Sequence, residues 1–318
     1  MKLGIIGYGN IGKKHHSAIQ NLDTITLEAL CDQLSIEDTN LRTYSSIDAF
    51  FQNEKDLDFV SICTPNAFHK TQCIQALNAG LNVICEKPFA LNTQDCQEII
   101  DAAKRNNKQL FCVMQNRFSN VMQWLKKTVD EQRLGKIYLI NLCCYWNRNK
   151  DYYRNSQWRG DSQLDGGTLF TQFSHYVDML YWAFGMISID HAMFGNFNHD
   201  DMISFEDTGT FNFSLEKGGF GNFSYTTSTF EKNFESTLSI ISEKGTLKIG
   251  GQYMNELIHC NIKDLEIPDI QKSDNLTHLK KLYQNTIANI NDGTAVMTTP
   301  DDGKNVVEII EKVYAYKK

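Results

Sequence analysis

The chain has 318 residues, of which 42% are hydrophobic and 22% charged, and its formal net charge is -7. A chain of this length can form two packed cores, so we expect two domains. Because binding to nucleic-acid phosphates needs clustered Lys and Arg, the acidic balance excludes a general nucleic-acid surface and favours a small-molecule partner.

No segment of the sequence indicates export or a membrane. The stretch from Met1 to Gly7 has one basic residue and an apolar run too short for a signal peptide. No apolar stretch approaches the length of a membrane-spanning helix. We therefore expect a cytoplasmic protein with no membrane partner.

The nine cysteines form no Cys-x-x-Cys pair. Four of them lie in or at the end of apolar runs, where a reduced thiol behaves as a small hydrophobic side chain: Cys31, Cys63, Cys85 and Cys112. We therefore expect reduced core cysteines rather than a disulfide framework, and no metal site.

The first third of the chain alternates short apolar runs with amphipathic segments. The apolar runs, expected as buried strands, are residues 2–6, 26–31, 57–63, 82–85 and 109–113. The expected helices are 11–20, 68–79 and 93–104, the last with Asn92 as its N-cap. This alternation predicts a doubly wound parallel α/β sheet over residues 1–118.

After residue 117 the pattern changes. A helix at 121–131 and a strand at 137–145 lead into a polar, aromatic-rich loop at 146–165 and a helix at 168–184. Alternating strands follow at 208–215, 220–227, 237–241 and 246–249, and helices at 276–291 and 303–314 close the chain. The pattern predicts an α+β domain over residues 119–318 with an open, mainly antiparallel sheet.

The segment Gly7-Tyr8-Gly9-Asn10-Ile11-Gly12 joins the first expected strand to the first expected helix with the spacing G-x-G-x-x-G. Glycine-rich turns alone are common, but this context is typical of a dinucleotide site. Gly7 would permit the tight turn, Gly9 the approach of a pyrophosphate, and Gly12 close packing of helix and strand. Asn10 and Ile11 would offer N–H groups of the helix N-terminus to the phosphates.

Asp32 lies 20 residues after Gly12, at the end of the second expected strand. A carboxylate there can accept hydrogen bonds from the adenosine ribose and would repel a 2′-phosphate, and the neighbouring Gln33 brings no positive charge. NAD is therefore favoured over NADP. A methyl donor such as S-adenosylmethionine could use a similar turn, but the later motifs favour hydride transfer.

Further motifs resemble those of the Gfo/Idh/MocA oxidoreductase family in order and spacing. They are Thr64-Pro65-Asn66 with His69, Glu86-Lys87-Pro88, Asn116-Arg117-Phe118, Trp158-Arg159-Gly160, and Gly166-Gly167 followed by His175 and Asp178. The resemblance implies a Rossmann domain and an α+β domain whose open sheet forms a homodimer or homotetramer.

The resemblance also implies roles for these residues. The cofactor contacts would include Thr64, Pro65, Asn66, His69, Glu86, Lys87, Asn116, Trp158 and Arg159. The substrate contacts would be Lys87, Thr171, Gln172 and His175, and the positively charged Arg117 and Arg154 are further candidates that the resemblance does not itself assign. The Lys87–Pro88 bond is often cis in this family, and Asp178 is expected to be structural.

The resemblance implies that Lys87 and His175 face the substrate hydroxyl, and the chemistry of alcohol oxidation makes such residues catalytic candidates. Hydride leaves the carbinol carbon while a base within hydrogen-bond reach removes the hydroxyl proton. Taken singly, Lys87 could be a solvated lysine and His175 a satisfied histidine on an apolar helix face. Their place in the family pattern favours catalysis, and which of the two takes the proton stays open.

The residue four before His175 bears on the substrate. Many polyol dehydrogenases of the family carry Asp there, whereas this chain has Thr171, which resembles the nucleotide-sugar members. Segments 205–209, 225–229 and 245–253 resemble the 3-dehydrogenases of UDP-N-acetylglucosaminuronic acid in bacterial surface-polysaccharide synthesis. Oxidation of a sugar C3 hydroxyl is therefore expected.

The loop at 146–159 is basic and aromatic. It contains Arg148, Lys150, Arg154 and Arg159 among Trp146, Tyr152, Tyr153 and Trp158. Such a mixture suits carboxylate, pyrophosphate and uracil recognition, although a solvated basic loop or a subunit contact would have the same composition.

Two other functions remain open. The chain could oxidise a free sugar or inositol, or it could be a non-catalytic NAD-binding sensor. The presence of both Lys87 and His175 argues against the sensor.

Overall fold

The computed structural model describes residues 1–37, 39–267 and 269–317, which form two compact units. The first unit contains residues 1–115 and 276–304, and the second contains residues 116–275 and the C-terminal segment from Asn305. This is not the division at residue 118 expected from the sequence, because the segment 276–304 returns to the first unit. Among the described residues, no helix is long and apolar enough to span a bilayer.

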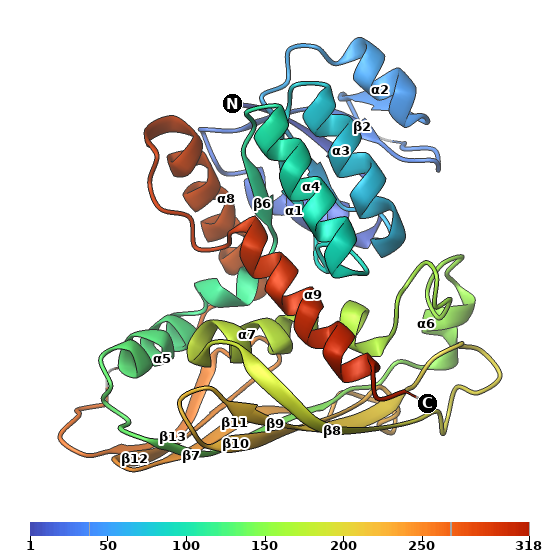
Figure 1. Cartoon of the computed structure of the whole chain (residues 1–318). Helices are drawn as coiled ribbons and strands as arrows, with labels where there is room; N and C mark the ends of the chain where they lie inside the picture. The colour runs from blue at the N-terminus through green and yellow to red at the C-terminus, as the bar shows by residue number, and fades with distance from the viewer. Residues whose placement is uncertain (38, 268, 318) are drawn as a thin grey trace. The chain divides into compact units, whose positions relative to one another are not determined.

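The first unit contains a six-stranded parallel sheet in the order β3-β2-β1-β4-β5-β6, of which Figure 1 labels β2 and β6. Its strands are β1 (Lys2–Ile6), β2 (Thr26–Cys31), β3 (Arg42–Tyr44), β4 (Phe59–Ile62), β5 (Asn82–Cys85) and β6 (Leu110–Cys112). The central strands are almost entirely buried, as their apolar runs predict. The doubly wound parallel sheet is confirmed. The short β3 was not expected, because its residues are largely exposed and form no apolar run.

The helices of the first unit are α1 (Asn10–Ile19), α2 (Ile47–Asn53), α3 (His69–Asn78), α4 (Thr93–Arg105) and α8 (Asn275–Asp292). The N-cap expected for α4 is confirmed, since Asn92 Oδ1 accepts a hydrogen bond from Asp95 N–H at 2.7 Å. The sequence pattern did not predict α2. Helix α9 (Pro300–Tyr314) begins in the first unit and continues in the second.

The second unit contains a seven-stranded sheet in the order β13-β12-β11-β7-β10-β9-β8. Its strands are β7 (Ile137–Tyr145), β8 (Ile187–Gly195), β9 (Thr208–Leu215), β10 (Phe220–Thr226), β11 (Glu235–Ser242), β12 (Gly245–Gly250) and β13 (Glu256–Ile262). All neighbours are antiparallel except β7 and β10, so the sheet is mixed but mainly antiparallel, as expected. β8 and β13 were not expected.

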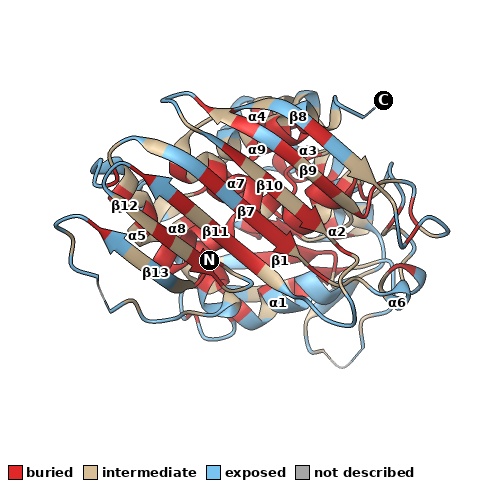
Figure 2. Ribbon diagram, turned by 90° about the horizontal axis from the view of Figure 1, so that it is seen from below, coloured by how far each residue is buried: buried red, intermediate tan, exposed pale blue. Residues whose placement is uncertain are grey.

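One face of this sheet carries the core of the second unit. Helices α5 (Asn120–Asp130) and α7 (Ser174–Phe184) lie on it, and Phe173, Phe211 and Phe223 are fully buried there. Figure 2 shows the ribbon from the opposite side, and residues coloured as exposed or intermediate alternate with buried ones along strands such as β10.

Two segments of the second unit differ from the sequence expectation. The loop at 146–165 contains a short helix, α6 (Lys150–Arg154), capped by Asn149. The helix expected at 168–184 begins with a π-helical turn, η3 (Leu169–Phe173), before α7 continues. Such turns often occur at functional sites, and this one carries Thr171 and Gln172.

Candidate active site

The turn between β1 and α1 requires glycine at two positions and leaves a third open. Gly7 has φ +89°, and a Cβ there would lie 2.7 Å from the carbonyl carbon of Cys63. A Cβ on Gly12 would lie 2.1 Å from the carbonyl oxygen of Gly7. At Gly9 an added Cβ would meet no described atom within 4 Å. Packing within the chain therefore does not require this glycine, whereas a pyrophosphate close to the backbone would.

The N-terminus of α1 is open to an anion. No described side chain caps it, its N-cap is Gly9, and its first turn contains no acidic residue. The first N–H groups of a helix lack partners within the helix, and the helix dipole adds partial positive charge. With exposed Asn10 and Ile11 at the first helical positions, this turn fits a dinucleotide pyrophosphate.

Asp32 follows β2 and belongs to the same turn. Its Oδ2 accepts a hydrogen bond from Tyr8 N–H at 2.6 Å, and its Oδ1 accepts one from Leu34 N–H at 2.9 Å. A carboxylate oxygen can accept more than one bond, so the half-buried Asp32 can hold the glycine turn and also accept from a ribose. Gln33 is exposed beside it.

The predicted cofactor residues of the first unit follow the carboxyl ends of adjacent strands. Thr64, Pro65 and Asn66 come after β4, which pairs with β1, and Glu86 and Lys87 come after β5. Ligands of open α/β sheets bind at this edge, where the strand order reverses. The glycine turn and both loops therefore lie at one edge of the sheet.

His69 joins these two loops. Its Nδ1 lies 2.7 Å from the Pro88 carbonyl oxygen, and its Nε2 lies 3.0 Å from the Thr64 carbonyl oxygen. Burial lowers the pKa of His69, although hydrogen bonds to the two carbonyls act to raise it. The Lys87–Pro88 peptide bond is cis, as the resemblance implies. His69 thus fixes the 64–66 turn against the loop that carries Lys87.

A buried chain of hydrogen bonds supports Glu86, which precedes Lys87. Glu86 Oε1 lies 2.9 Å from His15 Nε2, and His15 Nδ1 lies 2.6 Å from the Tyr283 hydroxyl. The Tyr283 hydroxyl in turn lies 2.6 Å from Ser61 Oγ. An ionised Glu86 only accepts, so His15 Nε2 donates to it, and in the neutral ring Nδ1 then accepts from Tyr283. Every member is thereby satisfied.

Glu86 also acts on its neighbour directly. Its Oε2 accepts a hydrogen bond from Lys87 N–H at 3.0 Å. The chain therefore runs from α8, through α1, to the peptide group of the predicted catalytic lysine. Lys87 is half-buried in the first unit, and His175 is half-buried in the second.

Arg117 is 1% exposed, and its charge is already compensated. Its Nη2 lies 2.5 Å from Asp178 Oδ1 in an ion pair, and its guanidinium lies 5.5 Å from the Trp182 ring. Asp178 is accordingly structural in its contacts, as expected, and the geometry does not favour a substrate contact for Arg117.

Asn116 is 2% exposed, and its Oδ1 is buried without a hydrogen-bond partner in the described part of the chain. A buried carbonyl oxygen without a partner costs free energy. The position is therefore compatible with the predicted contact to a cofactor amide or hydroxyl.

The segment from η3 to α7 positions the predicted substrate residues. Thr171 Oγ1 donates to the Asp165 carboxylate. Gln172 is 7% exposed, and its amide is engaged at both ends: Oε1 accepts from Arg148 Nε at 2.8 Å, and Nε2 donates to the Tyr152 hydroxyl at 2.7 Å. His175 lies three residues further along the same helical segment. Gln172 therefore supports two other side chains.

The remaining predicted residues belong to the loop after β7. Trp158 and Arg159 are half-buried, with the Arg159 guanidinium 5.3 Å from the Trp158 ring. Arg154 is exposed at the end of α6.

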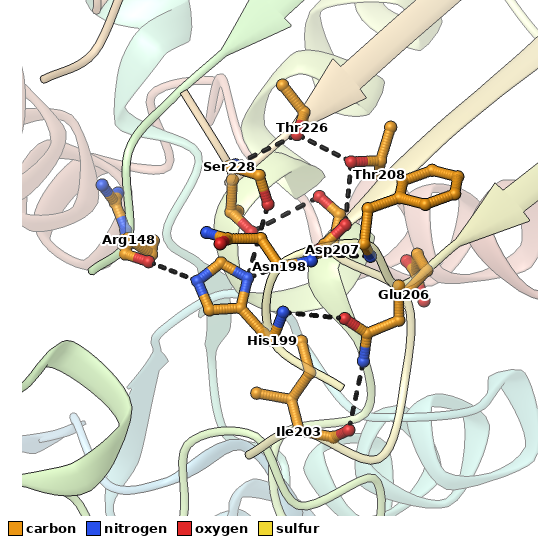
Figure 3. Close-up of polar contacts among 12 residues, drawn as sticks. Arg148, Asn198, His199, Ile203, Glu206, Asp207, Thr208, Thr226 and Ser228 are labelled. Carbon is orange, nitrogen blue, oxygen red and sulfur yellow. Dashed lines mark hydrogen bonds and ion pairs between the residues drawn. The ribbon is translucent and has the colours of Figure 1, made fainter. Parts of the chain in front are cut away.

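Figure 3 shows a buried histidine and aspartate next to this loop. His199 Nδ1 lies 3.1 Å from Asp207 Oδ2, and His199 Nε2 lies 2.7 Å from the Arg148 carbonyl oxygen. Asp207 also accepts hydrogen bonds from the N–H groups of Phe197 and Asn198. Both ring nitrogens face oxygen acceptors, so His199 clamps the backbone of Arg148 to the loop before β9.

Sequence reasoning missed His15, Tyr283, His199 and Asp207. Tyr283 and His15 are 268 residues apart, and His199 carries no motif, so only the fold brings these partners together. For Tyr283 the sequence offered one indication of a role, its hydroxyl-bearing side chain on the buried face of α8.

Comparison with known proteins agrees with the two units. Residues 1–114 match the family described as "Oxidoreductase family, NAD-binding Rossmann fold", and residues 122–248 match the "GFO/IDH/MocA C-terminal domain".

Two solved structures cover nearly the whole chain. The WlbA dehydrogenase from Chromobacterium violaceum, in complex with NADH and UDP-GlcNAcA, is 30% identical with a TM-score of 0.90, covering 99% of this chain and 93% of that one. The WlbA dehydrogenase from Bordetella pertussis, with the same ligands, is 27% identical with a TM-score of 0.92, covering 99% and 95%. An inositol 2-dehydrogenase of Salmonella typhimurium is 26% identical over 57% of this chain and 54% of its own length.

The glycine turn, the parallel sheet and these matches define an NAD-dependent dehydrogenase that acts on CH–OH groups. The chain belongs to the Gfo/Idh/MocA oxidoreductase family. The described residues contain no group of three or more His, Cys, Asp or Glu side chains that could hold a metal ion.

Proposed function

We propose that this enzyme oxidises the C3 hydroxyl of a UDP-N-acetyl-hexosaminuronic acid, or of a related nucleotide sugar, for bacterial surface-polysaccharide synthesis. The observation that carries the proposal is the likeness, over 99% of the chain, to two dehydrogenases whose structures contain NADH and UDP-GlcNAcA. The neutral Thr171 four residues before His175 supports the same substrate class.

In this proposal Lys87 and His175 act on the hydroxyl group of the substrate. One of them removes the hydroxyl proton while the other donates a hydrogen bond that holds the oxygen in place. Bound NAD supplies the hydride acceptor. Glu86 accepts from the Lys87 N–H and His69 contacts the Pro88 carbonyl oxygen, so the backbone is held on both sides of Lys87. Gly9, Asn10 and Asp32 hold the dinucleotide.

The test is an activity screen with NAD and a panel of UDP-uronic acids, UDP-hexoses and free polyols, followed by NADH absorbance. We expect turnover of UDP-N-acetylglucosaminuronate, with a 2-oxo acid added as electron acceptor if the cofactor stays bound between turnovers. Activity on free polyols alone would contradict the proposal.

Single variants test the catalytic pair. Lys87→Ala and His175→Ala should each lower kcat by about 100-fold or more, because general acid–base catalysis contributes about 10²–10⁴-fold. NAD affinity of His175→Ala should remain that of the wild type. Full activity in either variant would remove that residue from the proposed mechanism.

The second candidate is a dehydrogenase of a free sugar or inositol. The likeness to inositol 2-dehydrogenase favours it, but that likeness covers about half of either chain. The same screen decides between the two.

A further inference from the structure

The loop after β7 presents two arginines to one aromatic ring. The Arg148 guanidinium carbon lies 5.2 Å from the centre of the Tyr152 ring, and that of Arg159 lies 4.4 Å from it. Both distances are within the range of cation–π attraction, which runs to about 6 Å. The two charges therefore lie within about 10 Å of one another, the Debye length at about 0.1 M salt, and repel with incomplete screening.

Neither arginine forms an ion pair with a described carboxylate. The ion pairs of the structure include neither Arg148 nor Arg159, and Arg159 Nε is buried without a hydrogen-bond partner among the residues described. The chain has more acidic residues (38 Asp and Glu) than basic ones (31 Lys and Arg), yet neither arginine has an acidic ion-pair partner among the described residues. A confined cation without an ion-pair partner, as Arg148 is, favours an anion that comes from outside the chain.

Arg148 is held in place before any ligand binds. Its N–H donates to the Thr227 carbonyl oxygen at 2.8 Å, and its own carbonyl oxygen lies 2.7 Å from Nε2 of the fully buried His199 (Figure 3). Its guanidinium lies 4.8 Å from the centre of the Trp146 ring and donates from Nε to Gln172. Fixed orientation lowers the entropy cost of binding.

The fixed guanidinium still has N–H groups to offer. Nε donates to Gln172 and Nη1 donates to the Asn147 carbonyl oxygen. Nη2 has no acceptor within the described ranges, so it remains able to bind a carboxylate or phosphate oxygen.

Gln172 connects this cluster to the proposed site. It forms hydrogen bonds with both Arg148 and Tyr152 and precedes His175 by three residues. The residue that supports Arg148 and the proposed catalytic histidine therefore lie about one helical turn apart.

We propose that Arg148, aligned by Gln172, Trp146 and His199, binds an anionic group of the substrate, a carboxylate or a phosphate, and thereby selects anionic over neutral sugars. The proposal rests on the proposed function, in which the substrate carries both groups. Arg159 adds positive charge but also borders a surface pocket of about 620 Å³ that contains Asp161, Asp200 and Asp201. Arg148 is therefore the residue on which the test rests.

The test measures dissociation constants of the NADH-loaded enzyme by calorimetry, with UDP, D-glucuronate and UDP-N-acetylglucosaminuronate as probes. Arg148→Gln should weaken binding of UDP-N-acetylglucosaminuronate about tenfold to hundredfold, the effect of losing a charge-assisted hydrogen bond. A loss confined to UDP assigns the phosphate, and a loss confined to glucuronate assigns the carboxylate.

Lys150→Gln is the matched control. It removes a positive charge from the same loop, but the Lys150 ammonium is exposed and lies 3.3 Å from Asp201, so binding of all probes should change less than about twofold. Arg148→Lys keeps the charge and loses the planar fork, and should weaken binding by less than Arg148→Gln does. The NADH affinity and circular dichroism of each variant verify its fold.

Wild-type affinity of Arg148→Gln for every probe would overturn the inference, and so would a loss confined to NADH. Failure of the wild type to bind any of the three probes would also overturn it. Arg148-dependent binding without oxidation of UDP-N-acetylglucosaminuronate would contradict the proposed function and leave the inference standing. If the kcat/KM of Arg148→Gln on that substrate equals that of the wild type, the result contradicts the inference and leaves the proposed function standing.

Discussion

At the scale of single residues, the molecule depends on polar side chains that are buried and fully partnered. Tyr283 and His15 are fully buried, and the Tyr283 hydroxyl contacts both His15 Nδ1 and Ser61 Oγ. Since a buried polar atom is costly only when its partner is lost, these groups are sensitive to small changes.

The first prediction concerns the Tyr283 hydroxyl. Tyr283→Phe should lower the free energy of unfolding by about 1–3 kcal/mol, because it leaves His15 Nδ1 and Ser61 without that partner. Urea denaturation followed by circular dichroism measures the change. The matched control is Tyr316→Phe, whose hydroxyl donates at the surface to the Ile189 carbonyl oxygen and should cost less than about 0.5 kcal/mol. Equal effects at the two positions would contradict the role of the buried chain.

The second prediction concerns Asp207. Burial acts to raise the pKa of its carboxyl, but hydrogen bonds from His199, Asn198 and Thr208 outweigh burial and hold the pKa well below its usual range. A carboxyl whose pKa is lowered in the folded state stabilises the fold above the unfolded pKa of about 3.9, and this stabilisation disappears as the pH falls through the folded pKa.

Asp207→Asn should therefore cost about 1–3 kcal/mol near pH 7, because it replaces the charged acceptor that faces His199 Nδ1 and the N–H groups of Phe197 and Asn198 with a neutral one. The difference in unfolding free energy between the variant and the wild type should stay constant down to about pH 4 and shrink only below it. A difference that already shrinks between pH 7 and pH 5 would show that another group governs it.

At the scale of elements, the turn between β1 and α1 separates what the fold requires from what the cofactor requires. A Cβ at Gly12 would lie 2.1 Å from the Gly7 carbonyl oxygen, whereas a Cβ at Gly9 would meet no described atom within 4 Å. Both glycines belong to the same motif, but each is there for a different physical reason.

The third prediction follows from this difference. Gly12→Ala should lower the melting temperature by several degrees or prevent folding, because backbone must move to relieve the clash. Gly9→Ala should leave the melting temperature within about 2 °C and weaken NAD binding at least about tenfold, as measured by calorimetry. Unchanged NAD affinity in Gly9→Ala would show that the pyrophosphate does not lie against this glycine.

The elements also show how far the sequence could predict the fold. Strands with continuous apolar runs, such as β1 and β5, and helices with a recognisable cap, such as α4, were predicted within a residue of their bounds. β3 and β13 were missed because they are short or half-exposed and have neither an apolar run nor clear alternation.

The site was predictable to a different extent. Motifs placed the residues of Gly7–Gly12, Asp32 and Glu86-Lys87-Pro88, because turn geometry, the approach of a cofactor and the family pattern each call for those residue types at that spacing. The supports of these residues were not predictable, since the contacts of Glu86 with His15 and of Arg148 with His199 depend on long-range packing.

At the scale of the whole molecule, the open face of the second sheet is a candidate subunit interface. Asn212, Asn222 and Asn141 lie in register across β9, β10 and β7, and Phe220 is 62% exposed. Such a surface suits self-association, because its amides can pair with a second copy while its apolar side chains lose contact with water.

The fourth prediction tests this interface. Asn222→Lys should shift the protein from a dimer or tetramer toward the monomer in light scattering coupled to size-exclusion chromatography, because association would bring like charges together. Gln52→Lys, which adds the same charge at an exposed position of α2, should leave the mass unchanged. A monomeric wild type would contradict the interface itself.

The return of residues 276–304 to the first unit has a consequence for how the protein is made. Tyr283 completes the buried chain that begins at His15, and a ribosome delivers the N-terminal end first. The strands that hold the dinucleotide turn are thus synthesised long before their last packing partner. The NAD-binding unit reaches its final form only after the entire sheet of the other unit has emerged.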